Sequence, residues 1–162
     1  MDTALSQQSL EEMLDTVVRE VTETTAGIRL YHDTQPPAGE LCTIYITFQK
    51  GLHSGISLCA EAAMLRRMTQ NFIQSEDVTL QDLEDFSKEY FNVVCGRVAA
   101  ILFKTTKVAA RFSVPDFYQG RYRPDGFQDQ FVLTYSSDQR ENAELTHHVP
   151  HQDGDEIMTT LT

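Results

Sequence analysis

The longest periodic segment of the chain, from residue 80 to about residue 104, constrains the fold more than any other feature. Thr79 can cap the start of a helix there, and acidic residues follow near the positive end of that helix. Apolar residues recur at the spacing of a helix that buries one broad face, at Leu83, Phe86, Tyr90, Phe91, Val94, Val98, Ile101 and Leu102. The segment therefore predicts a domain built around one central helix.

Shorter segments predict the elements around this helix. A first helix is expected over residues 9–26, with Ser9 and Glu12 as a capping box and Gly27 as its stop. A second is expected over residues 61–74, with an apolar set of Met64, Leu65, Met68, Phe72 and Ile73. Runs of β-branched and aromatic residues predict strands over 28–32, 41–48, 55–59, 108–114, 130–135 and 144–149. We expect an α+β fold in which an antiparallel sheet packs against long amphipathic helices.

Composition limits the partners and the compartment. The net charge is −11, so a nucleic acid would be repelled. No stretch approaches the ~20 consecutive apolar residues that cross a bilayer, and residues 1–8 lack the pattern of a secretory signal. We expect a cytoplasmic protein with one domain over residues 1–149 and a flexible acidic tail over residues 150–162.

The cysteines and histidines do not predict a metal or cofactor site. Three cysteines lie among apolar neighbours without CxxC spacing, namely Cys42, Cys59 and Cys95. We interpret them as buried thiols, the first two of which would lie near each other across a tight hairpin. His147 and His148 would point to opposite faces of a strand, so they cannot easily chelate one ion with His151. The glycines and serines form neither a nucleotide loop nor a nucleophile elbow.

The exposed side of the central helix carries the residues of chemical interest. Asp85, Glu89 and Asn92 are spaced i, i+4 and i+7, which places them on a single helical line. A carboxylate can pair with a cation, and a carboxamide can hold a water at a fixed angle. The spacing alone is also that of an ordinary solvated helix face.

The residues around this pair resemble a known signature. The stretch from Asp85 to Gly96, which reads DFSKEYFNVVCG, looks like the signature helix of the CheC/CheX/FliY chemotaxis phosphatases. In that family an acidic or Ser residue is followed by Glu, Asn and a Gly at these spacings. The order of elements, and the segment that starts at Pro115, are also similar to a CheX-like chain. The resemblance extends over residues 10–149.

The resemblance implies a phosphatase that hydrolyses the aspartyl phosphate of a CheY-type response regulator. By position, Glu89 would pair with the regulator's active-site Lys, and Asn92 would orient the attacking water. Asp85, Lys88 and Gly96 would be partner contacts. The chain itself would bind no cofactor, since Mg²⁺ would come with the regulator.

Two departures from the family pattern keep an alternative open. The family usually has Asn after its Gly, but Arg97 stands here, and the first helix has no second Glu/Asn pair. One site per chain is therefore expected, as in CheX. The alternative is a non-catalytic module that binds a response regulator or a dimer partner without hydrolysis. A CheX-like homodimer is expected, and either residues 44–48 or the last strands would supply its edge.

Overall fold

The computed structural model describes residues 5–50 and 53–151, which form three helices and one seven-stranded sheet. The helices are α1 (Gln7–Ala26), α2 (Ala62–Ile73) and α3 (Leu80–Thr106). The strands are β1 (Leu30–His32), β2 (Leu41–Lys50), β3 (Gly55–Glu61), β4 (Arg111–Phe112), β5 (Asp116–Gln119), β6 (Phe127–Ser137) and β7 (Asn142–Pro150). The predicted α+β class is confirmed.

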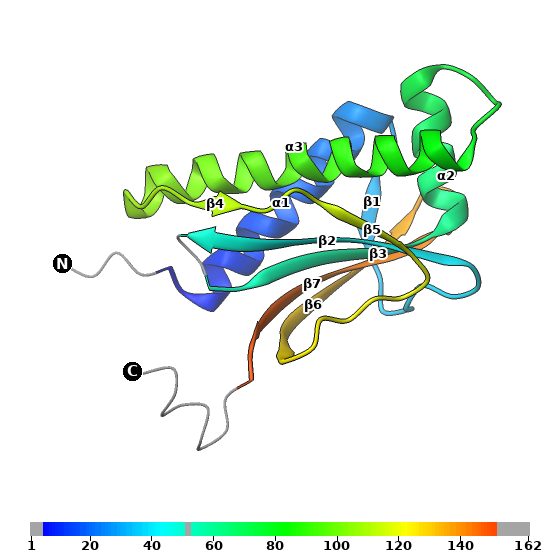
Figure 1. The fold of residues 1–162 in the computed structure, drawn as a ribbon. Coiled ribbons are helices and arrows are strands. Elements are labelled where there is room, and N and C mark those ends of the chain that lie inside the picture. The colour runs from blue at the N-terminus through cyan, green and yellow to red at the C-terminus, as the bar shows by residue number, and fades with distance from the viewer. Residues whose placement is uncertain (1–4, 51–52, 152–162) are drawn as a thin grey trace.

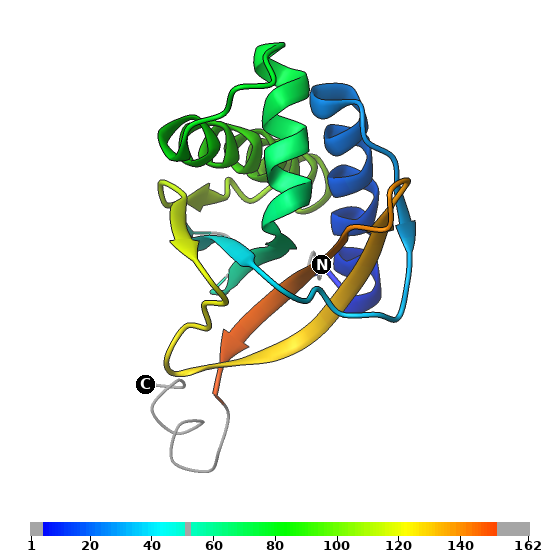
Figure 2. The ribbon, with the colours of Figure 1, turned by 90° about the vertical axis from the view of Figure 1, so that its right-hand side faces the viewer.

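Every strand pairing in the sheet is antiparallel. The order is β1-β6-β7-β3-β2-β4, and β5 also pairs with the outer edge of β2. All three helices cover one face of the sheet, and α3 lies across it beside β4 and β5 (Figures 1 and 2). The dimer edge predicted on residues 44–48 is wrong, because β4 and β5 pair with that side of β2. Of the last strands, β7 lies between β6 and β3, whereas β1 pairs with β6 only at residues 135–137, so a dimer edge on β6 stays a prediction.

The face of the sheet that meets the helices is apolar. Strand alternation sends every second side chain toward the helices, and the register aligns these residues across neighbouring strands. The buried set includes Ile44, Ile46, Ile56, Leu58, Ala60 and Leu145. Burial of this surface against the helices is the main stabilising term of the fold.

The opposite face of the sheet carries polar side chains beneath the β5–β6 loop. This polar layer consists of Ser57, Arg121, Asp129, Glu144 and His148. Arg121 pairs with Glu144, and His148 lies between Ser57 and Asp129. The loop is fixed to β2, because Thr43 donates to the carbonyl of Gly120 and accepts from the backbone of Tyr122.

The boundaries of several elements differ from those expected from sequence. α1 begins earlier, since Ser6 is the N-cap and accepts from the backbone of Ser9, which is already helical. Gly27 ends α1 in the left-handed region as predicted. The strand expected over residues 108–114 is reduced to β4, and β5 follows Pro115 in a segment for which no strand was expected. Most of the expected acidic tail, residues 152–162, lies outside the described residues.

The cysteines are buried and free, as expected, but the first two do not face each other. Cys42 is paired with Ala60 and Cys59 with Thr43, so their side chains lie on opposite faces of the sheet. The hairpin register places them one residue apart, and one residue reverses the face on which a side chain lies.

Candidate functional site

The buried side of α3 fixes the orientation of the helix. Its apolar residues pack against the sheet and α1, and Tyr90 adds a polar contact through its hydroxyl, 2.7 Å from Thr22 Oγ1 of α1. The Tyr90 ring stacks on Phe86 at 5.9 Å, and burial raises the pKa of Tyr90 to about 12. A capping box of Thr79 and Asp82 starts the helix. Rotation of α3 would break these contacts, so the outward face is fixed.

Four of the predicted site residues lie along the outward face. Asp85, Glu89, Asn92 and Gly96 are all exposed, at spacings that return to the same side of the helix. We call these four residues the outer line. Along it, Glu89 and Asn92 are separated by about 4.5 Å of helix rise. A partner that approaches α3 from solvent therefore meets a carboxylate and an amide together.

The outer-line residues differ in how far their polar groups are already engaged. Asp85 accepts a hydrogen bond of 2.8 Å from Gln81, and Lys88, at the side of the line, forms a 2.9 Å ion pair with Glu84 that raises the Lys88 pKa. Glu89 and Asn92 have no hydrogen bond or ion pair to any described side chain. The two predicted catalytic residues are therefore free for an external partner.

Gly96 has no packing role within the described chain. A Cβ built on it meets no atom within 4 Å other than its chain neighbours and the adjacent backbone of its own helix. Glycine in a helix interior costs about 1 kcal/mol relative to alanine. The structure thus shows open space over this part of the outer line, one turn beyond Asn92.

Arg97, the departure from the family pattern, points toward α1. Its guanidinium forms an ion pair of 3.3 Å with Glu20. The side chain therefore ties α3 to α1 at the side of the outer line. The substitution leaves Glu89 and Asn92 uncovered.

A small apolar hollow lies beside Glu89, between the end of α2 and the start of α3. This α2–α3 groove has a volume of about 170 Å³ and is lined by Phe72, Ile73, Asp82, Asp85, Phe86 and Glu89. Phe72 and Ile73, the last members of the apolar set predicted for this helix, are 50% and 39% exposed. They occupy the last turn of α2, which extends past the edge of the core, and helical spacing alone does not reveal that.

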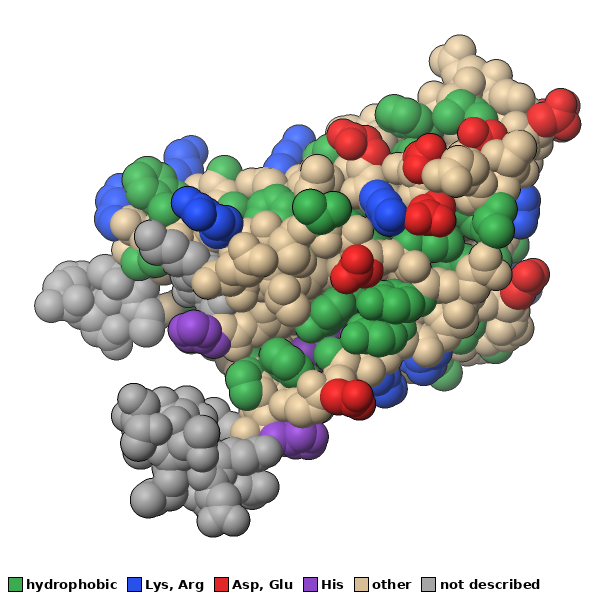
Figure 3. Space-filling model, in the orientation of Figure 1, with side chains coloured by type: hydrophobic (Ala, Val, Ile, Leu, Met, Phe, Trp, Pro, Cys, Tyr) green, Lys and Arg blue, Asp and Glu red, His purple; other side chains and the backbone are tan. Residues whose placement is uncertain are grey.

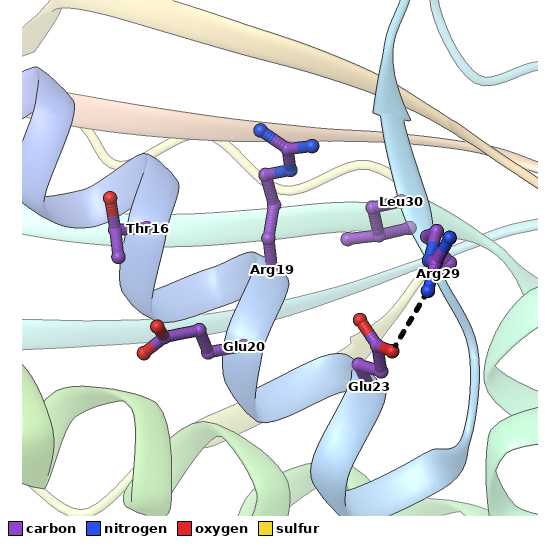
Figure 4. Close-up of a pocket in the computed structure, with 6 residues that line it drawn as sticks. All are labelled: Thr16, Arg19, Glu20, Glu23, Arg29 and Leu30. Carbon is purple, nitrogen blue, oxygen red and sulfur yellow. Dashed lines mark hydrogen bonds and ion pairs between the residues drawn. The ribbon is translucent and has the colours of Figure 1, made fainter.

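A second hollow, between α1 and β1, contains only charges that are already paired (Figure 4). Its ion pairs are Arg29 with Glu23 at 3.4 Å, Arg19 with Asp15 at 3.6 Å, and Glu20 with Arg97. Charges paired in this way offer little to a ligand.

The polar layer brings together a Ser, a His and an Asp that sequence reasoning did not connect. Ser57 Oγ lies 2.8 Å from His148 Nε2, and His148 Nδ1 lies 3.3 Å from Asp129 Oδ1. The order is that of a hydrolytic triad. However, Ser57 is 4% and His148 2% exposed, so the hydroxyl cannot meet a substrate. The cluster satisfies buried polar groups and is structural.

The histidine pair on β7 behaves as the strand alternation predicts. His148 faces the polar layer, whereas His147 pairs in register with Ile56 on the helix-facing side and contacts Gln130 at 2.7 Å. Among the described residues no group of three or more His, Cys, Asp or Glu is placed to hold a metal ion. No described helix is both long and apolar enough to span a membrane.

Comparison with known proteins identifies the fold. No family model matches the chain, and no curated protein matches its sequence. Solved structures do match. Chemotaxis protein CheX from Vibrio vulnificus superimposes with a TM-score of 0.70 at 16% identity, covering 89% of this chain and 98% of that protein.

Two further structures extend the likeness. CheX in a CheX–CheY–BeF₃–Mg²⁺ complex from Borrelia burgdorferi matches with a TM-score of 0.70 at 10% identity, covering 88% of this chain and 98% of that one. FliY from Thermotoga maritima matches with a TM-score of 0.61 at 10% identity, covering 91% of this chain and 92% of that one. The chain is structurally similar to the CheX/CheC/FliY chemotaxis proteins over nearly all of its described length, and its fold is CheX-like.

Proposed function

We propose that the protein is a phosphatase for the aspartyl phosphate of a CheY-type response regulator. The observation that carries this proposal is the outward presentation of Glu89 and Asn92, free of intramolecular partners, on the central helix of a CheX-like fold. The structure of a related CheX bound to CheY with beryllofluoride and Mg²⁺ supports a regulator as the partner.

In the proposed reaction, Asn92 accepts a hydrogen bond from a water and holds it in line with phosphorus. The water oxygen forms the new P–O bond, the bond between phosphorus and the aspartyl oxygen breaks, and the aspartate leaves as a carboxylate. Both protons of the water leave with the product as dihydrogen phosphate, so the step balances without a proton from this chain. Glu89 pairs with a lysine of the regulator and so fixes the approach of Asn92. Mg²⁺ belongs to the regulator, where it neutralises charge on the phosphoryl group.

Positioning is the whole contribution of this chain, because an amide is not a nucleophile. Holding a water in an attack geometry can supply a rate increase on the order of 100-fold or more. Asp85 and Gly96 also belong to the outer line and would contact the regulator. Lys88, at the side of the outer line, would contact the regulator at the edge of the interface.

The test is phosphate release from a phosphorylated CheY-type receiver domain with Mg²⁺, comparing the parent with Glu89→Ala and Asn92→Ala. We expect acceleration by the parent, strong loss in both variants, and retained binding of the beryllofluoride-activated regulator by Asn92→Ala. Binding by the parent without acceleration would favour the non-catalytic module instead. Circular dichroism of all three chains controls for folding.

A further inference from the structure

The α2–α3 groove lies within the surface that a regulator on Glu89 must cover. A protein interface of ordinary size buries about 800 Å² on each partner, which corresponds to a disc of roughly 16 Å radius. Asp85 and Glu89 line the groove and also belong to the outer line. Any partner centred on Glu89 and Asn92 therefore extends over the groove.

The groove combines an apolar interior with an acidic rim. Phe86 is buried at its floor, and the Phe72 ring packs against it at 5.2 Å while remaining half exposed. Three carboxylates line the groove, those of Asp82, Asp85 and Glu89, and none of its lining residues is basic. In Figure 3, hydrophobic and acidic side chains lie side by side over this part of the molecule, whereas basic side chains gather around the C-terminal end of α3.

We infer that the groove is an anchor site for the same regulator. It takes one large apolar side chain that stands beside a lysine or arginine on the regulator's surface. This inference rests on the proposed function for the identity of the partner. The apolar side chain would bury Phe72 and Ile73, and the neighbouring cation would meet the carboxylate rim.

The volume fits this occupant. A hollow of about 170 Å³ accommodates one large aliphatic or aromatic side chain, but not a separate small-molecule ligand of ordinary size. Apolar anchors in such pockets supply most of the affinity of many interfaces. Glu89 and Asn92 would then determine the chemistry, and the groove would determine the affinity.

The test measures binding of a CheY-type receiver domain, activated with beryllofluoride and Mg²⁺, to the full chain. Phe72→Ala and Ile73→Ala are expected to raise the Kd roughly tenfold each, with kcat at saturating regulator unchanged within twofold. The matched controls are Tyr31→Ala on β1 and Val132→Ala on β6, whose parent side chains are 47% and 41% exposed. These controls should leave the Kd within twofold of the parent.

The possible outcomes separate the groove from the catalytic proposal. Groove variants that bind as tightly as the parent, with the parent active, overturn the anchor site alone. A parent that binds without hydrolysis overturns the phosphatase, while the Kd values still decide the groove. A parent that binds no regulator overturns both. The Asp85→Asn variant tests the cation. If its Kd for the regulator depends on salt concentration as strongly as the parent's, the proposed occupant has no cation beside Asp85.

Discussion

Polar side chains are concentrated in two regions of this molecule, which differ in whether those side chains have partners within the chain. On the outer line, Glu89 and Asn92 are exposed and form no hydrogen bond or ion pair with another described side chain. In the polar layer, Ser57, Glu144 and His148 are buried and each has a polar partner. Buried polar groups must be satisfied or the fold loses stability, whereas exposed unpaired groups contribute little to it. The outer line is thus available for function, and the polar layer serves the fold.

Acid should have the largest effect, through two buried histidines: His148 of the polar layer and His147, which faces the helices. Burial lowers the pKa of His147 to about 4 and also lowers that of His148. These histidines become protonated below about pH 6.5 in the unfolded chain, whereas in the folded chain they stay neutral until a lower pH. The contribution of the neutral histidines to the free energy of unfolding is therefore fully present above pH 7. It is lost as the pH drops toward 4, and the loss is about 3 kcal/mol for His147. Urea unfolding at several pH values measures this.

The control for this pH dependence is His147→Gln, which keeps an amide near Gln130 and removes the titrating ring. Its stability should depend less on pH than the parent's between pH 6.5 and 4. An unchanged slope would show that other groups cause the acid sensitivity. The outer line contains no histidine, so the same substitution should leave regulator binding at pH 7.5 unaffected.

The next largest effect concerns activity alone. Asn92→Ala should lower phosphatase kcat about 100-fold, because the amide positions the water, and should change the free energy of unfolding by less than about 0.5 kcal/mol. Phosphate-release kinetics and urea unfolding give the two numbers. A loss of unfolding free energy of about 2 kcal/mol or more would contradict this assignment, because it would give Asn92 a structural role.

Glu144→Ala should give the opposite pattern. The substitution leaves Arg121 without its partner above the sheet. Breaking a fully buried pair costs roughly 3–5 kcal/mol, and the partial exposure of Arg121 reduces the expected loss to about 2 kcal/mol. Phosphatase activity per folded molecule should stay within twofold. Urea unfolding measures the loss of stability, and phosphate-release kinetics at a temperature where the variant is folded measure the activity. A large loss of activity would contradict the separation of the two regions.

The residues that sequence reasoning placed correctly are those governed by local rules. The long apolar repeat and the Thr79 cap define α3, and helical geometry then places Glu89 and Asn92 on one line. The opposite faces of His147 and His148 follow from strand alternation. For these features neighbouring residues hold the necessary information.

The features that the sequence did not reveal depend on tertiary contacts. β5 forms because β2 offers an open edge after Pro115, and the exposure of Phe72 and Ile73 depends on where α2 ends relative to α3. The cluster of Ser57, Asp129 and His148 joins three strands. Helix and strand periodicity cannot report contacts between segments so far apart in the chain.

The smallest expected effect bears on Gly96, the one outer-line residue without a side chain. Gly96→Ala should raise the free energy of unfolding by about 0.5–1 kcal/mol, because the methyl group enters open space and the helix loses a flexible residue. Ala100→Gly, one turn further along α3, should lower it by a similar amount. For a domain of this size each change shifts the Tm by about 1–4 °C.

Regulator binding decides what the open space above Gly96 is for. If the regulator's backbone approaches α3 at this point, the added methyl group should weaken binding several-fold while it stabilises the free protein. A stability gain together with a binding loss identifies a surface kept open for a partner at the expense of helix stability. Gly96→Ala that binds the activated regulator as tightly as the parent would remove Gly96 from the interface. The interface would then depend on Glu89, Asn92 and the α2–α3 groove.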